Sequence, residues 1–112
     1  MGVLIDEKDA MSRLGNNKKL YAMLLKKFDG LAVLETLKDK LADGDAAASQ
    51  AQAHTIKGIA ANLSLHDLRE KSEAIEQTLK TAGSTDGIDA SEITSSTSAT
   101  VEAVKTWLSE NA

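Results

Sequence analysis

The fold is decided by residues 46–63, which read AAASQAQAHTIKGIAANL. Apolar residues recur here every three or four positions, at Ala53, Ile56, Ile59, Ala60 and Leu63. This spacing predicts an amphipathic helix from about Ala46 to Asn62 with one side facing a core. Asp45 stands just before it and is a residue type that caps helix N-termini well.

His54 is predicted to lie on the outer side of this helix. It stands two residues before Ile56, and two residues cover about 200° of a helix with 3.6 residues per turn. The residues that share its face are Ala47, Gln50, Ala51, Lys57, Gly58 and Ala61, and most of them are very small. Glycine inside a helix costs about 1 kcal/mol relative to alanine. Gly58, one turn after His54, would leave room beside the imidazole for another protein.

This arrangement is suited to carrying a phosphoryl group. A neutral imidazole nitrogen is nucleophilic at physiological pH. The ammonium of Lys57 can offset negative charge on a group attached to the ring. Phosphoryl transfer depends mainly on positioning and charge neutralisation. Each residue also has an ordinary interpretation: His54 as a surface histidine, Lys57 as a solvated charge, and Gly58 as a packing glycine where two helices approach closely.

The rest of the chain also favours helix. There is no proline and there are only three aromatic residues among 112, and proline is the strongest helix breaker. We expect a short helix from Asp6 to Leu14, a break at residues 15–17, and a helical stretch over residues 18–42 that Asp29 and Gly30 kink or divide. The apolar stripe of that stretch comprises Leu20, Met23, Leu24, Phe28, Leu31, Leu34, Leu37 and Leu41.

Two further helices are expected after the histidine helix. The first runs from about Leu65 to Thr81, with Ser64 and Asp67 as a capping pair and with Leu68, Ala74, Ile75 and Leu79 buried. The last is begun by the capping pattern of Asp89 and Glu92 and reaches Trp107 and Leu108. Its inner stripe is Ile93, Thr97, Thr100, Val101, Val104 and Leu108. Residues 94–100 are rich in Ser and Thr, which are poor helix formers, so this part is either helical or partly frayed.

Four long amphipathic segments with short connections predict an all-α fold. We expect an antiparallel up-down-up-down four-helix bundle with an additional short N-terminal helix, forming a single domain over residues 1–112.

Several functional classes are disfavoured by composition. The net charge is −4 and the thirteen basic residues are dispersed, which argues against nucleic acid. No apolar run approaches the roughly 18 residues of a membrane span, and we see no signal-peptide pattern, so a cytoplasmic protein is expected. There is no cysteine, and His66, the only other histidine, belongs to no dense ligand set, so we expect no metal site. Without a glycine-rich phosphate loop we expect no kinase activity of its own.

Residues 53–63 resemble the signature of histidine-containing phosphotransfer (Hpt) domains: a His, two residues, Lys, Gly, then small residues. The similarity continues at Leu68 and at Ala74-Ile75-Glu76. Upstream it includes Arg13-Leu14-Gly15-Asn16, the stretch from Leu20 to Phe28, and Gly44-Asp45. It covers roughly residues 6 to 80. Ile59 and Ser64 depart from the pattern, because a small residue and a glycine are commoner at those places. Ile59 would add apolar contact or fill core, and Ser64 would cap the next helix.

The resemblance implies a phosphorelay intermediate. His54 would accept a phosphoryl group on Nε2 from a receiver-domain aspartate and pass it to another receiver aspartate. Lys57 would steady the group and Gly58 would give access. Glu76 stands where family members often have Gln or Glu near the histidine. It would either orient the imidazole through the other ring nitrogen or be an ordinary exposed carboxylate.

The expected partners are response-regulator receiver domains, with a hybrid histidine kinase as a further candidate. They would contact Gln50, Ala51, Lys57, Gly58 and Ala61. The chain would need no cofactor of its own, because Mg²⁺ would be held by the receiver, and a monomer is expected. Two alternatives stay open: the phosphate-accepting domain of a chemotaxis-type histidine kinase, and a helical protein-interaction module in which His54 is incidental.

Overall fold

The computed structural model describes residues 2–111, which form six α-helices and no strand. The prediction of an all-helical chain is therefore confirmed. The helices are α1 (Glu7–Arg13), α2 (Lys18–Lys26), α3 (Gly30–Ala42), α4 (Ala46–Asn62), α5 (His66–Ala82) and α6 (Ser91–Asn111). The molecule is elongated, with extents of 42 × 23 × 21 Å.

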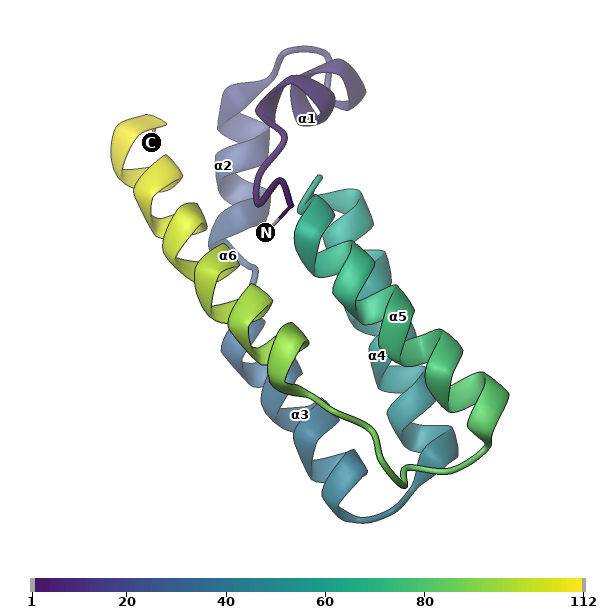
Figure 1. Cartoon of the computed structure of the whole chain (residues 1–112). Helices are drawn as coiled ribbons and strands as arrows, with labels where there is room; N and C mark the ends of the chain where they lie inside the picture. Colours follow the sequence, from purple (N-terminus) through teal and green to yellow (C-terminus); the bar gives the residue numbers. More distant parts are fainter. Residues whose placement is uncertain (1, 112) are drawn as a thin grey trace.

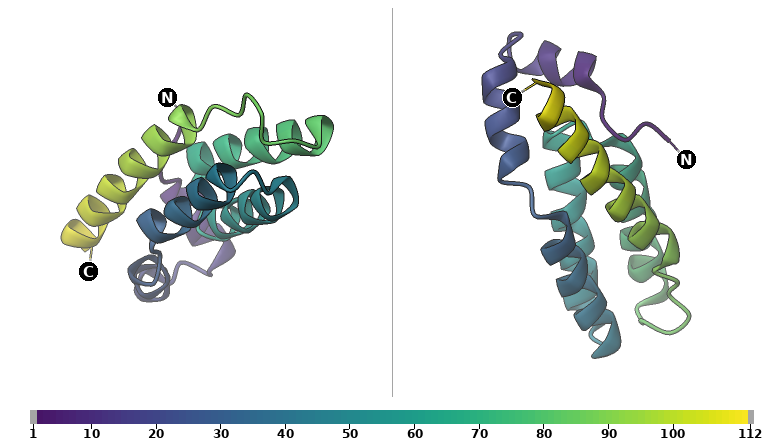
Figure 2. Two further views of the ribbon diagram at one scale, coloured as in Figure 1. Left: turned by 90° about the horizontal axis from the view of Figure 1, so that it is seen from below. Right: turned by 90° about the vertical axis from the view of Figure 1, so that its left-hand side faces the viewer.

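Four helices enclose the main core, and Figure 1 shows them lying along the long axis. Each packs on two of the others, in the cyclic order α3, α4, α5, α6 and back to α3. The most extensive of these interfaces joins α4 to α5. At one end of the molecule α2 packs on α6, and α1 crosses beside α2 (Figures 1 and 2). The histidine helix α4 is thus covered by α3 and α5 and keeps one side on the outside.

Aspartate and asparagine caps begin most of these helices. The side chains of Asp6, Asn17, Asp29 and Asp45 each accept a hydrogen bond from the backbone N–H three residues later. Asp29 begins α3 after α2 has ended, so the stretch over residues 18–42 is divided and not kinked. Gly30 is closely packed here, because an added Cβ would lie 2.8 Å from the Phe28 ring and 2.9 Å from Val101 on α6.

The division of that stretch overturns part of the predicted core. Met23 and Leu31 are 54% and 56% exposed, so their assignment to the buried stripe was wrong. Instead α2 buries Tyr21, Ala22 and Leu25. A single periodic stripe cannot describe residues 18–42, because α2 and α3 are separate helices with different neighbours: α2 packs on α1 and α6, whereas α3 packs on α4 and α6.

The turn between α4 and α5 also differs from the prediction. Ser64 does not cap α5, which starts after Leu65 without a side-chain cap. Ser64 has φ 58°, in the left-handed region that favours the glycine commoner at this place. Its hydroxyl donates to the Asp9 carboxylate of α1 at 2.7 Å. Asp67, the other predicted capping residue, is buried and accepts from the Gly2 backbone N–H at 2.9 Å.

Helices α5 and α6 bury more polar groups than their sequences suggested. Ala74 of α5 is exposed and was wrongly placed in the core, whereas Ser72 and Glu76 are buried. Helix α6 is continuous through the Ser/Thr-rich run, and buries Ser96, Thr97 and Thr100 together with Ile93, Val104 and Trp107. The predicted Val101 and Leu108 are only half-buried. None of the helices within residues 2–111 is long and apolar enough to cross a membrane.

Candidate functional site

Helix α4 presents His54 to solvent. Asp45 caps the helix by accepting from the Ala48 N–H at 3.0 Å. Its inner side buries Ser49, Ala53, Ile56 and Ala60, whereas the His54 side chain is 67% exposed. This agrees with the outward orientation predicted from the spacing between His54 and Ile56.

The inner edge of the His54 ring is held by Glu76 of α5. Nδ1 of His54 lies 2.8 Å from Oε2 of Glu76. An ionised carboxylate can only accept a hydrogen bond, so Nδ1 carries the proton and donates it. The tautomer is then fixed with the lone pair on Nε2, and no protein group within residues 2–111 hydrogen-bonds Nε2. The nitrogen that is free to react is therefore the outer one.

Glu76 is not an exposed surface carboxylate, because its side chain is only 11% exposed. Its other oxygen, Oε1, lies 2.6 Å from Nζ of Lys57, which is itself only 26% exposed. The Lys57 ammonium is the main cause that lowers the pKa of Glu76, and the contact with His54 adds to it, while burial acts in the opposite direction. The result is a chain of contacts, Lys57–Glu76–His54, in which the buried carboxylate stays ionised.

Gly58 has no packing role in this structure. A Cβ added to it would meet nothing within 4 Å, so the interpretation of Gly58 as a glycine at a close helix contact is wrong. Because Gly58 lies one turn from His54, the position next to the imidazole on that side carries no side chain.

The other predicted docking residues lie along the same helix. Ala51 is exposed, and Gln50 and Ala61 are half-buried. The Arg13 guanidinium, supplied by α1, donates to the Ala61 carbonyl oxygen. The sequence analysis did not predict this contact and named Arg13 only in the family resemblance. The two residues are 48 positions apart, and helical periodicity gives no information on contacts between separate helices.

An apolar groove of about 350 Å³ is lined in part by the C-terminal half of α4, the helix that carries His54. Ile59, which departs from the family pattern, lines this groove and also packs against the core, so its half-buried side chain both adds apolar contact and fills core. The other lining residues come from α2, α3, the connection between them and the end of α4: Leu24, Lys27, Phe28, Asp29, Val33, Asn62 and Leu63.

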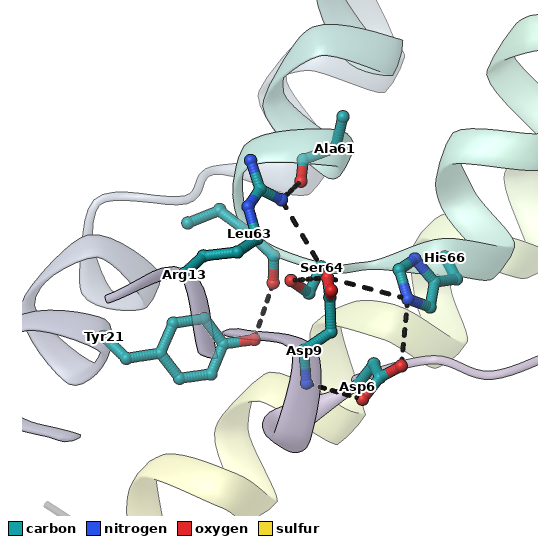
Figure 3. Close-up of polar contacts among 8 residues, drawn as sticks. All are labelled: Asp6, Asp9, Arg13, Tyr21, Ala61, Leu63, Ser64 and His66. Atoms are coloured by element: carbon teal, nitrogen blue, oxygen red, sulfur yellow. Dashed lines mark hydrogen bonds and ion pairs between the residues drawn. The ribbon is translucent and has the colours of Figure 1, made fainter. Parts of the chain in front are cut away.

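A polar cluster ties α1 to the turn after α4, as Figure 3 shows. Nε2 of His66 lies 3.1 Å from the Asp6 carboxylate and 3.9 Å from that of Asp9. The Asp9 backbone N–H is the main cause that lowers the pKa of Asp6, and His66 adds to it. The Tyr21 hydroxyl donates to the Leu63 carbonyl oxygen at 2.6 Å. His66 thus belongs to a structural cluster at the end of α4 and not to the His54 site.

The chain belongs to the Hpt domain family, because the model of that family, described as Hpt domain, matches residues 23–109 of 112. The match begins within α2, so α1 lies outside it, and it includes most of α6, where the sequence alone showed no usable resemblance. No curated protein and no solved structure matches the chain. Hpt domains transfer phosphoryl groups through a histidine in phosphorelays, lack kinase activity of their own, and interact with receiver domains of response regulators and with kinases.

Proposed function

We propose that this chain, as a single Hpt domain over residues 1–112, is a phosphorelay intermediate that carries a phosphoryl group on His54. The observation that carries the proposal is the exposed imidazole whose inner nitrogen is hydrogen-bonded to a buried carboxylate. That contact leaves Nε2 as the nucleophile and directs it outward.

In the proposed reaction Nε2 attacks the phosphorus of an aspartyl phosphate on a receiver domain. The N–P bond forms as the P–O bond to the aspartate breaks, and the aspartate leaves as a carboxylate. The second transfer reverses these bonds toward another receiver aspartate. Glu76 orients the ring, Lys57 offsets the negative charge of the phosphoryl group, and Gly58 admits the partner.

The proposed partner surface is formed by Gln50, Ala51, Lys57, Gly58 and Ala61. The receiver supplies Mg²⁺, and this chain supplies no cofactor. The complex is transient, because a relay must release each partner. The scaffold is an antiparallel up-down-up-down bundle of α3 to α6, supported by their packing order and their directions in Figure 1. The proposal includes a monomer that acts in the cytoplasm and has no kinase activity.

The test is phosphoryl transfer from labelled receiver domains of the same organism, with Mg²⁺, to the wild type and to His54→Gln. His66→Gln is the matched control, because it removes the other histidine and leaves the His54 site intact. We expect acid-labile, base-stable label on the wild type and on His66→Gln, and none on His54→Gln. The proposal fails if no receiver labels the folded wild type. Labelling by a kinase domain and ATP alone would instead support the chemotaxis-type alternative.

A further inference from the structure

The contact between Glu76 and His54 has a consequence for the phosphorylated state as well as for the free one. Once Nε2 carries a phosphoryl group, the ring is a cation for as long as Nδ1 keeps its proton, and neutral if that proton is lost. The buried carboxylate lies 2.8 Å from this nitrogen. An anion at that distance favours the protonated, cationic ring.

We propose that Glu76 keeps the proton on Nδ1 of phosphorylated His54, so that the ring departs as a neutral imidazole when the receiver aspartate attacks. This inference rests on the proposed function of His54. It makes Glu76 a positioning residue that acts through the ring and does not touch the phosphoryl group.

The atoms and charges balance in this step. The receiver carboxylate attacks phosphorus, the N–P bond breaks, and its electron pair returns to Nε2. With the proton retained on Nδ1, the leaving group is neutral imidazole in the tautomer that Glu76 already binds in the free protein. Without that proton the same bond would have to expel an imidazolate anion, which is a far poorer leaving group.

The surroundings support a carboxylate that stays charged throughout. Lys57 contacts the second oxygen of Glu76 at 2.6 Å, so the carboxylate pairs with a cation on one side and with the ring on the other. Among the residues that the structure describes, the ion pairs of Glu76 are with these two groups of α4, and α3 contributes none. On α5 itself the charged residues about one turn away are Glu73 and Lys80, and both are exposed.

The variant that tests the inference is Glu76→Gln, which keeps the shape of the side chain and removes its charge. Wild type, Glu76→Gln and the exposed control Glu73→Gln would be phosphorylated with phosphoramidate, a small-molecule donor that needs no receiver. Nitrogen NMR would then follow the protonation of Nδ1 with pH. We expect the wild type and Glu73→Gln to keep the proton to a higher pH than Glu76→Gln and than free Nε2-phosphohistidine.

The second measurement is the rate of transfer to a receiver as a function of pH. Glu76→Gln should lose rate about tenfold per pH unit above the pH at which its ring is half-protonated, whereas the wild type should lose rate only at higher pH. A purely structural role of Glu76 would lower the rate equally at all pH values. Equal NMR titrations and parallel pH–rate profiles in wild type and Glu76→Gln would overturn the inference while leaving the proposed function intact.

Failure of the proposed function has a different signature. If no receiver exchanges phosphoryl groups with the wild type, the relay reading is wrong, yet the NMR titration still measures the effect of Glu76 on the ring. If Glu76→Gln does not fold, the wild type alone decides. A phosphorylated His54 that loses its Nδ1 proton at the same pH as free phosphohistidine would refute the inference.

Discussion

Replacing Gly58 by alanine should stabilise the fold, whereas a larger side chain at the same position should impair function. Nothing lies within 4 Å of a Cβ at this position, so the change adds no clash and removes the cost of a glycine inside a helix. That cost is about 1 kcal/mol, which corresponds to a rise of about 4 °C in the melting temperature of a domain of this size.

Gly30→Ala is the matched comparison, because it is the same substitution in a crowded place. Its Cβ would lie 2.8 Å from the Phe28 ring and 2.9 Å from Val101. Overpacking of this kind costs about 1–3 kcal/mol, so Gly30→Ala should melt below the wild type. Circular dichroism melts and urea titrations of the two variants give the comparison directly.

The functional half of the prediction uses a larger side chain. Gly58→Leu should fold, but its side chain would stand beside the imidazole where the receiver must approach. A displacement of about 1 Å from reacting geometry can lower a rate about 100-fold, and we expect a loss of this order in transfer to a receiver. Thr106→Leu is the control, since Thr106 is exposed on α6, which does not contact α4.

Two results would refute this reasoning. A Gly58→Ala variant that melts below the wild type would mean that the space around Gly58 is not open. A stable Gly58→Leu variant that accepts phosphoryl groups at the wild-type rate would mean that the partner does not approach over this position.

Two further predictions concern the turn after α4. Ser64→Ala keeps the left-handed backbone but loses the hydrogen bond to Asp9, so it should lose about 1 kcal/mol in urea unfolding, whereas Ser64→Gly also relieves about 1 kcal/mol of strain and should be near neutral. Tyr21→Phe removes the hydrogen bond to the Leu63 carbonyl and should cost about 1–2 kcal/mol. Burial is the main cause that raises the pKa of Tyr21 to about 12. The folded state therefore favours the neutral phenol, and this contribution is complete below about pH 10 and is lost as pH rises toward 12. Urea midpoints at pH 8 and pH 11 should accordingly differ more in wild type than in Tyr21→Phe, and equal differences would contradict the assignment.

Local signals made the histidine helix predictable. The Asp45 cap and the spacing of Ala53, Ile56 and Ala60 determine both where α4 begins and which side it buries, and α4 spans the predicted residues. The same method failed for Met23 and Leu31, because their burial depends on how α2 and α3 are oriented after the chain divides at Asp29.

The site could be predicted only as far as it lies on one helix. The exposure of His54 and the neighbouring positions of Lys57 and Gly58 follow from helical geometry alone. Whether Glu76 faces α4 or solvent depends on the rotation of α5 against α4. The sequence of α5 did not decide between a residue that orients the imidazole and an exposed carboxylate. The contact of Arg13 with the end of α4 depends on how α1 packs, and nothing in the sequence of α4 predicts that packing.

The position of Glu76 also connects the chemistry of the site to the stability of the bundle. A buried carboxylate is costly unless it is paired, and removing one partner of a buried ion pair is strongly destabilising. Lys57 therefore serves the interface between α4 and α5 as well as any phosphoryl group on His54, and its pairing at 2.6 Å is present without that group. Loss of transfer in a Lys57→Ala variant would combine a lost phosphate contact with a Glu76 that has lost its main stabilising charge. The roles of the three residues are consequently separable only through changes that keep shape and remove charge, with the pH dependence of transfer as the measured quantity.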